Sequence, residues 1–542
     1  MRNDLLNGEG MFKALLIAFF AILSFSMAAG EDVSEDALII ATDGSFIMQG
    51  NMLFGIGSSG STGTFAYEHL LVRNRKGGYD GELADSWESN EDATQWTFDL
   101  VDARWHDGQP FTSEDVQFTY EYIKENRLWL SSVLSNVDHV ECPDERTAVF
   151  QLKSPSPAFL DDLSHCPGIY IIPKHFWKDI EDPTHYVDEE WVGTGPFKFE
   201  SMVPDQFVRL VANEEYHGTK PLVEQIIIKV IPNKDSQVLA LKSGDVDVVS
   251  DLSPAVAKIL QGTDGIEVFT APATRGYELG FNLNNSPTDK VEFRKAMAHA
   301  VDRQQICDIV FYGYATPTDT TFLMPGVAYD FVNQDVPGDD YKYDPEKTQD
   351  MLDSLGYADI DGDGYREDAD GSDLVMTMPI SGTGSYESRI AEILKEDWKD
   401  LGIKVELRQV DSSQKQDEYH KSNFFVVGMP YLMHDDVDDL THFEVDSHFG
   451  KANWYDYNDS DYNSLAEELR STADPDERKR IGYRMQEILA QDVPTVPICG
   501  ADVIFAYRSD RFSGWEDVEP IMWGVDTSML LNVAQCEKNM RR

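Results

Sequence analysis

Short apolar segments alternate with amphipathic segments along the chain from residue 37 onward. Residues 37–41 are continuously apolar, which predicts a buried strand. Residues 95–100 alternate between apolar and polar side chains, as a half-buried strand does. A further strand is expected over residues 225–231, a mostly apolar run that Pro232 follows directly.

Helices are predicted between these strands. Residues 112–115 read Thr-Ser-Glu-Asp, a helix start in which a hydroxyl group caps the first turn and acidic groups face its positive end. Apolar residues at helical spacing over 390–401 predict another helix, which ends at Gly402 before a strand over 403–407. No fixed-period repeat or low-complexity linker interrupts this alternation. We therefore expect an α/β protein whose lobes are joined by crossing strands.

The first 30 residues have the pattern of a secretory signal peptide. An apolar run over residues 14–25 follows a short basic lead, and small residues precede acidic sequence that begins at Glu31. The run is too short for a bilayer span, which needs about 20 residues. Either Met1 or Met11 could be the true start. We expect an exported protein without a lipid anchor, because the first cysteine is Cys142.

The charge balance excludes several classes of partner. The chain has 542 residues with 97 Asp and Glu against 45 Lys and Arg, a formal net charge of −52. Such a surface repels nucleic acids and anionic lipids, and salt adaptation is its simplest explanation. A hydrophobic content of 42% is enough for packed cores, and the length suggests roughly two to four domains.

The cysteines give little evidence of a metal site. The chain has five, an odd number, and none lie in a CxxC pair. A disulfide between Cys142 and Cys166 in an oxidising compartment remains open.

An acidic segment that begins at residue 359 matches the first half of a calcium-binding loop. Asp359, Asp361 and Asp363 occupy positions 1, 3 and 5, a glycine follows at position 6, and the Tyr365 carbonyl falls at position 7. Position 12 is Asp370, and no paired helices flank the loop. We predict an isolated structural Ca²⁺ site; the alternative is a solvated acidic turn.

Other motifs are weaker. Residues 55–60 match GxGxxG, but without the βαβ context of a dinucleotide site they are better read as a flexible loop. Histidines and aspartates concentrate over residues 433–442, either as a solvated acidic loop or as metal ligands. The signatures GxSxG, HExxH and GxxxxGK[ST] are missing, so we expect no enzyme and no cofactor for activity.

Ordered motifs across residues 37–515 resemble the bacterial extracellular solute-binding proteins of family five, the peptide- and nickel-type binding proteins of ABC importers. The clearest are GELADSWE at 81–88, WHDGQPFTSEDV at 105–116, GTGPFKF at 193–199, NEEYHG at 213–218 and SGDVD at 243–247. His217 stands where the family usually has Trp.

The resemblance implies a two-lobed periplasmic-binding-protein-like α/β fold, type II and large, with an extra subdomain, a discontinuous first domain and a hinge. The implied domains are the signal peptide at 1–30, lobe I from 31–72, 187–282 and 497–535, the extra subdomain at 73–186, and lobe II at 283–496.

The resemblance also implies where a ligand binds. Peptide binders of the family hold the α-amino group with an Asp after a Gly-Trp strand. Here Met429 replaces that Trp, Asp435 is the candidate counter-ion, and His434 leaves a chelated metal such as nickel open. The candidate ligand-lining residues are Gly57, Ser58, Trp129, Tyr277, Met429, His434, Asp435 and Trp454.

The implied function is capture of a peptide or similar solute and its delivery to ABC permease subunits at the outer face of the cytoplasmic membrane, by a monomer that binds no nucleic acid. A nickel-chelate binder of the same importer class is one alternative. A sensor that presents its ligand to a membrane receptor is another. A secreted calcium-stabilised hydrolase is disfavoured, because no nucleophile motif is present.

Overall fold

The structure is a computed structural model. It describes residues 34, 36–43, 63–74, 78–128, 131, 133–157, 159–164, 169–186, 188, 190–318, 331–333, 335–336, 341–368, 371–382, 384–429, 437, 440, 443, 453–472, 474–515 and 534–535. Among the helices in these ranges, none combines the length and the apolar character needed to cross a bilayer.

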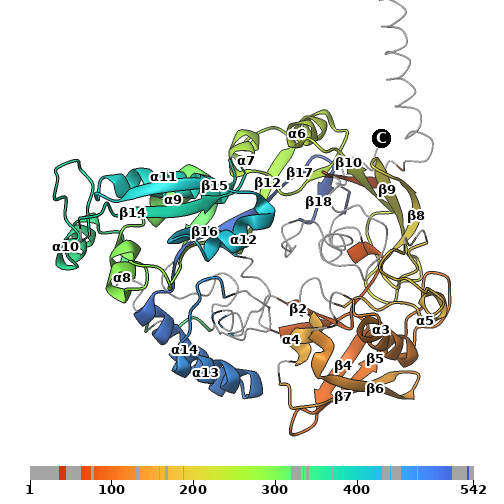
Figure 1. The fold of residues 1–542 in the computed structure, drawn as a ribbon. Helices are drawn as coiled ribbons and strands as arrows, with labels where there is room; N and C mark the ends of the chain where they lie inside the picture. The colour runs from red at the N-terminus through yellow and green to blue at the C-terminus, as the bar shows by residue number, and fades with distance from the viewer. Residues whose placement is uncertain are drawn as a thin grey trace, which may run out of the picture.

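One mixed sheet runs through the molecule in the order β16-β12-β17-β11-β1-β10-β9-β8, with β13 beside β17 (Figure 1). Its strands are β1 (Ala37–Thr42), β8 (Phe197–Val203), β9 (Phe207–Ala212), β10 (Gln225–Val230), β11 (Val248–Val249), β12 (Ile266–Phe281), β13 (Ala315–Pro317), β16 (Phe424–Met429) and β17 (Thr495–Arg508). The predicted strands at 37–41 and 225–231 are confirmed as β1 and β10, which pair in parallel.

The first lobe is built on β1 and its neighbours. The helices α6 (Lys234–Ser243) and α7 (Pro254–Leu260) pack near this part of the sheet. Apolar side chains of β1, β10 and β11, such as Leu38, Ile226 and Val248, are fully buried in its core. The continuous apolar runs seen in the sequence thus belong to strands that are covered on both faces.

A subdomain with its own core lies beside the first lobe. Its antiparallel sheet has the order β4-β5-β7-β6, from β4 (Ala84–Ser89), β5 (Gln95–Leu100), β6 (Val137–Asp144) and β7 (Thr147–Leu152). Helix α3 (Ser113–Glu125) starts with the predicted capping arrangement, in which Thr112 and Asp115 cap each other's backbone groups. Trp105 is buried and donates from its indole to Asp115, so the WHDGQPFTSEDV motif is structural.

The remaining elements of this half are short. They are β2 (Leu71–Asn74), β3 (Gly78–Gly81), α4 (Phe159–Ser164), α5 (Lys174–Trp177), β18 (Phe512–Ser513), β19 (Ala534–Gln535) and the 3-10 turns η1 (Gly63–Phe65) and η3 (Val133–Asn136). Cys142 carries a free thiol that donates to the Ser113 carbonyl at 3.2 Å, and Cys166 lies outside the described residues.

The second lobe carries most of the helices. They are α8 (Val291–His299), α9 (Arg303–Phe311), α10 (Pro345–Ser354), α11 (Tyr386–Lys399), α12 (Lys415–Tyr419), α13 (Ser460–Ser471) and α14 (Pro475–Asp492), with the 3-10 turn η6 (Ser412–Gln414) and the parallel pair β14 (Val375–Ile380) and β15 (Lys404–Gln409). The helix predicted over 390–401 is α11, and its Trp398 is fully buried.

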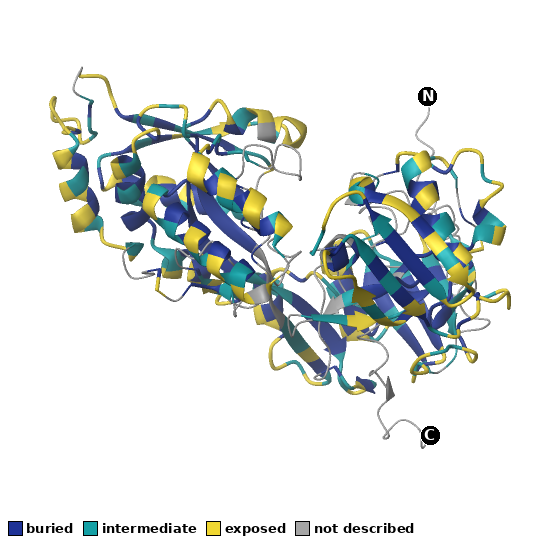
Figure 2. Cartoon of the chain, turned by 90° about the horizontal axis from the view of Figure 1, so that it is seen from below, coloured by how far each residue is buried: buried dark blue, intermediate teal, exposed yellow. Residues whose placement is uncertain are grey.

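Two long strands connect the lobes. The first part of β12 pairs with the last part of β17 in the first lobe, where Ile266 and Ile504 share one core. The second part of β12 pairs with the start of β17 in the second lobe, where Leu279 and Val496 share another. The pairing slips between Ala271 and Arg275. Figure 2 shows the two bodies side by side, joined by strands at their lower edge.

Candidate functional site

The carboxyl end of β16 lies beside the middle of β12, one of the two strands that cross between the lobes: Met429 pairs with Gly276. Gly428 pairs with Tyr277 of β12. A Cβ atom at Gly428 would lie 3.1 Å from the Tyr277 ring and 3.5 Å from a Glu387 carboxylate oxygen. Glycine therefore lets a ring and a charged group approach the strand end closely.

A charged pair stands beside this strand end. Glu387 lies in the first turn of α11, where a carboxylate is favoured by the positive end of the helix. Lys415, at the start of α12, places its Nζ 3.3 Å from Glu387 Oε1. The Glu387 side chain is only 26% exposed and the Lys415 side chain only 16%. Both charges are therefore mostly shielded from water, and each can attract an opposite charge more strongly than at an open surface.

Aromatic groups and a second carboxylate surround the pair. Tyr419 of α12 is buried, and burial followed by the charges of Glu387 and Glu278 raises its pKa well above the ordinary value. Glu278 is 1% exposed and accepts a hydrogen bond from the Tyr455 hydroxyl. The ring of Trp454 lies 5.8 Å from that of Tyr419. This corner of the second lobe therefore gathers two carboxylates, one ammonium group and several aromatic rings beside the end of β16.

The structure describes two of the eight predicted ligand-lining side chains. Tyr277 is 3% exposed and packs in the core against Phe311 and Tyr386. Trp454 is partly exposed and lies next to Tyr419. The strand position of Met429 is described but its side chain is not. The other five predicted residues lie outside the described residues, namely Gly57, Ser58, Trp129, His434 and Asp435.

Glu387 and Lys415 are not in the sequence prediction. They come from two elements that no motif links, and the signal that could have found them is the position of each at a helix start. The structure brings them next to the strand end that precedes His434 and Asp435.

A second polar cluster lies in the first lobe. Glu68 is 2% exposed, accepts from the Tyr216 hydroxyl at 2.8 Å and lies 3.1 Å from His217 Nε2. Burial, and then the negative charge of Glu68, raise the pKa of Tyr216. His217, which departs from the family pattern, therefore has a carboxylate partner inside the lobe.

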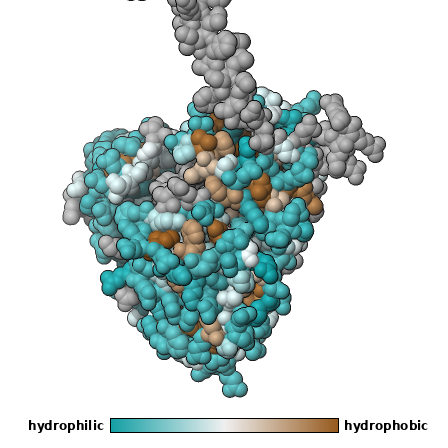
Figure 3. All heavy atoms as spheres, turned by 90° about the vertical axis from the view of Figure 1, so that its right-hand side faces the viewer, coloured by the Kyte–Doolittle hydropathy of each residue, from teal (hydrophilic) through white to brown (hydrophobic). Residues whose placement is uncertain are grey.

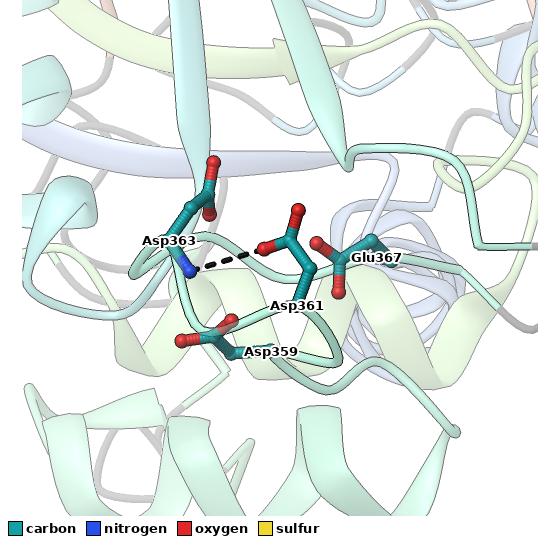
Figure 4. Close-up of side chains that lie close together, drawn as sticks. All are labelled: Asp359, Asp361, Asp363 and Glu367. Carbon is teal, nitrogen blue, oxygen red and sulfur yellow. Dashed lines mark hydrogen bonds between the residues drawn. The ribbon is translucent and has the colours of Figure 1, made fainter.

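The predicted calcium loop gathers acidic groups between α10 and β14. Asp359, Asp361, Asp363 and Glu367 each offer a carboxylate oxygen, and these oxygens lie within 4.8 Å of one another. Figure 4 shows the four side chains, with the Glu367 carboxylate turned toward that of Asp361. The sequence prediction did not include Glu367.

Tyr365 and Asp370 are the other two residues that the sequence predicts as ligands in this loop. The Tyr365 backbone amide donates to Asp363 at 2.8 Å, and the role of its carbonyl as a ligand stays a prediction. Asp370, predicted at position 12, lies outside the described residues.

Comparison with known proteins identifies a family. The family described as bacterial extracellular solute-binding proteins, family 5, matches residues 78–451. A candidate ABC transporter peptide-binding protein of Brucella ovis is 31% identical over 297 residues. That match covers 52% of this chain and 53% of the relative, so the chain spans about half of that protein's length.

A second relative and one solved structure extend the comparison. The nickel-binding periplasmic protein of Escherichia coli is 28% identical over 68% of this chain and 72% of its own length. The crystal structure of a periplasmic oligopeptide-binding protein of an ABC transporter from Thermotoga maritima superposes with a TM-score of 0.81 at 22% identity, covering 93% of this chain and all of that one. This likeness shows that the fold is that of periplasmic binding proteins.

Proposed function

Because this chain belongs to the bacterial extracellular solute-binding proteins of family 5, we propose that it captures a peptide between its lobes and delivers it to the membrane subunits of an ABC importer. The family consists of binding proteins, so the chain is not an enzyme. The observation that carries the proposal is the family match over residues 78–451. The two-lobed fold with two crossing strands supports it.

Binding in such a fold is a hinge motion. A solute that touches both lobes has more contacts in the closed state than in the open one, and this difference in affinity supplies the driving force for closure. The slip in pairing between β12 and β17 at Ala271 lies between the two cores. We propose that the change in backbone angles is concentrated there, because an irregular stretch bends more easily than a regular ladder.

The charged corner of the second lobe suits a peptide. A peptide is zwitterionic, and Lys415 and Glu387 offer one charge of each sign within 3.3 Å. We propose that a peptide terminus exchanges with one partner of this pair and that Asp435, which follows β16, binds the α-amino group. Charge-assisted hydrogen bonds of this kind are strong where water is excluded.

The first test is identification of the solute, followed by one substitution. Native mass spectrometry of the protein as purified should show a retained peptide mass. Asp435→Ala should then weaken peptide binding about tenfold or more, which is about 1.4 kcal/mol, as measured by calorimetry. Asp350→Ala on the exposed face of α10 is the matched control and should bind as the wild type does. Unchanged affinity in Asp435→Ala would remove Asp435 from the site.

A metal chelate is the second candidate. It is favoured by the nickel-binding Escherichia coli relative and by His434, since imidazole is a good ligand for nickel. Metal analysis before and after chelation separates the two ligands. His434→Ala should abolish nickel binding if a chelate is the solute, and should leave peptide affinity within a few-fold if a peptide is.

A further inference from the structure

We propose that Asp359, Asp361, Asp363 and Glu367 bind one structural Ca²⁺ ion in the second lobe (Figure 4). The acidic residues alone do not carry this proposal, because the three aspartates are exposed and exposed acidic turns are common. The proposal rests on the fourth carboxylate, that of Glu367, because this side chain is buried.

Glu367 is 3% exposed, so its charge is removed from water. Its Oε2 accepts a hydrogen bond from the Ile360 amide at 2.6 Å. Its Oε1 is buried, and among the residues that the structure describes none provides a hydrogen-bond partner for it. A buried carboxylate oxygen without a partner is costly, and a cation held by the Glu367 carboxylate and the three aspartates would offset that cost.

The donor set selects the kind of cation. The described ligands are all carboxylates, which hard cations prefer and which suit Ca²⁺ better than softer transition metals. At a Ca–O distance of about 2.4 Å, two oxygens on opposite sides of the ion lie about 4.8 Å apart. The four oxygens lie within 4.8 Å of one another, so small inward rotations of the exposed aspartate side chains would bring all of them to one calcium ion.

The loop is attached to the rest of the lobe on both sides of Glu367. The Glu367 amide donates to the Ala358 carbonyl at 2.9 Å, and the Arg366 amide donates to the Gly402 carbonyl at 2.7 Å. Gly402 follows the carboxyl end of α11. An ion in the loop would therefore hold the segment between α10 and β14 against the end of α11.

The ion would be remote from the charged corner. Glu387 lies in the first turn of α11, and the loop contacts the turn after its last residue. A helix of 14 residues is about 20 Å long. The proposed ion therefore stabilises the lobe without touching the candidate solute site.

The test compares wild-type protein with Glu367→Gln, with and without calcium. In Gln, the amide oxygen can still accept from Ile360, but the charge is gone. In chelator we expect Glu367→Gln to melt at or above the wild-type temperature, because a buried unpaired charge is removed. With saturating Ca²⁺ we expect wild type to gain about 5 °C or more and the variant to gain little, so that the order of stability reverses.

Two further measurements keep the test decisive. Calorimetry should give one saturable Ca²⁺ site per wild-type chain, with affinity at least tenfold weaker in Asp361→Asn, whose side chain is exposed and whose loss should not prevent folding. Asp350→Asn on α10 should retain full affinity. Equal stabilisation of both Glu367→Gln and wild type by Ca²⁺, or the same gain from NaCl of equal ionic strength, would show non-specific screening of the acidic surface and overturn the proposal.

Discussion

Asp247 shows how a single residue of a family motif acts inside the fold. It belongs to the SGDVD segment and is fully buried. One carboxylate oxygen lies 2.7 Å from Arg511 Nη1, and the other accepts from the Ile39 amide at 2.9 Å. The side chain thus connects β1 to the segment after β17. Burial outweighs the attraction of Arg511 and raises the pKa of Asp247 to about 6.

This raised pKa predicts a pH dependence of stability. A carboxyl group whose pKa is higher in the folded state stabilises the fold fully below its unfolded pKa, near 4, and that contribution is lost as the pH rises through about 6. Asp247→Asn lacks this titration. The wild-type free energy of unfolding, minus that of the variant, should therefore fall by about 3 kcal/mol between about pH 3.5 and pH 7.

Urea unfolding of both proteins at a series of pH values and constant salt measures this difference. The remaining acidic groups titrate in both proteins and cancel. A difference that stays flat or rises over this range would contradict the assignment of the raised pKa to Asp247.

At the scale of elements, the contact between β12 and β16 depends on a glycine. A Cβ atom at Gly280 would lie 2.2 Å from the ring of Phe425. That ring is fully buried and stacks on Tyr419 at a centroid distance of 4.3 Å. It has no room to move aside, so strand β16 would have to shift.

We predict that Gly280→Ala destabilises the protein by about 1–3 kcal/mol, the usual cost of overpacking a core. The comparison is Gly428→Ala on the same strand pair, where the nearest atom is 3.1 Å from the added Cβ and the cost should be smaller. Chemical denaturation of the two variants gives the free energies. Equal losses of unfolding free energy in the two variants would mean that the Phe425 ring moves aside, contrary to this prediction.

Single strands and helices could be predicted from the sequence more easily than the pairing of strands in the sheet. The alternation at 95–100 coincides with β5, and the Thr-Ser-Glu-Asp start coincides with α3, because both signals are local. The sequence could not predict that β1 pairs with both β10 and β11, since pairing depends on segments far apart in the chain.

Candidate site residues could be predicted only where their spacing along the sequence formed a recognisable motif. The spacing of Asp359, Asp361 and Asp363 predicted one turn with converging oxygens. Glu367 was missed, because a template of 12 positions pointed to Asp370, while the bridges of Glu367 to Ala358 and Asp373 turn the chain back earlier. Glu387 and Lys415 meet only after α11 and α12 have packed.

At the scale of the whole molecule, the net charge of −52 is the dominant property. Hydrophilic residues cover most of the face shown in Figure 3. Acidic groups outnumber basic groups by about two to one, so most surface carboxylates have no basic partner available and repel one another. Folding brings these charges together, and self-repulsion lowers stability.

Salt should therefore stabilise this protein. Raising NaCl from about 0.05 M to about 1 M shortens the Debye length from over 10 Å to about 3 Å, and we predict a clear increase in the free energy of unfolding in urea. Chelator in every sample removes any contribution from bound calcium. A constant or decreasing free energy would show that surface repulsion is not a significant cost.

The two crossing strands also have a consequence for the order of assembly. The first lobe needs Ile40 beside Val248 and Val248 beside Tyr507, so its sheet joins segments from nearly opposite ends of the chain. Closing so long a loop is entropically costly and slow. The second lobe shortens that loop, because its folding brings Gly280 next to Thr495 and sets β17 in register along β12. Damage to the second lobe should therefore delay completion of the first lobe, even at positions where the two never touch.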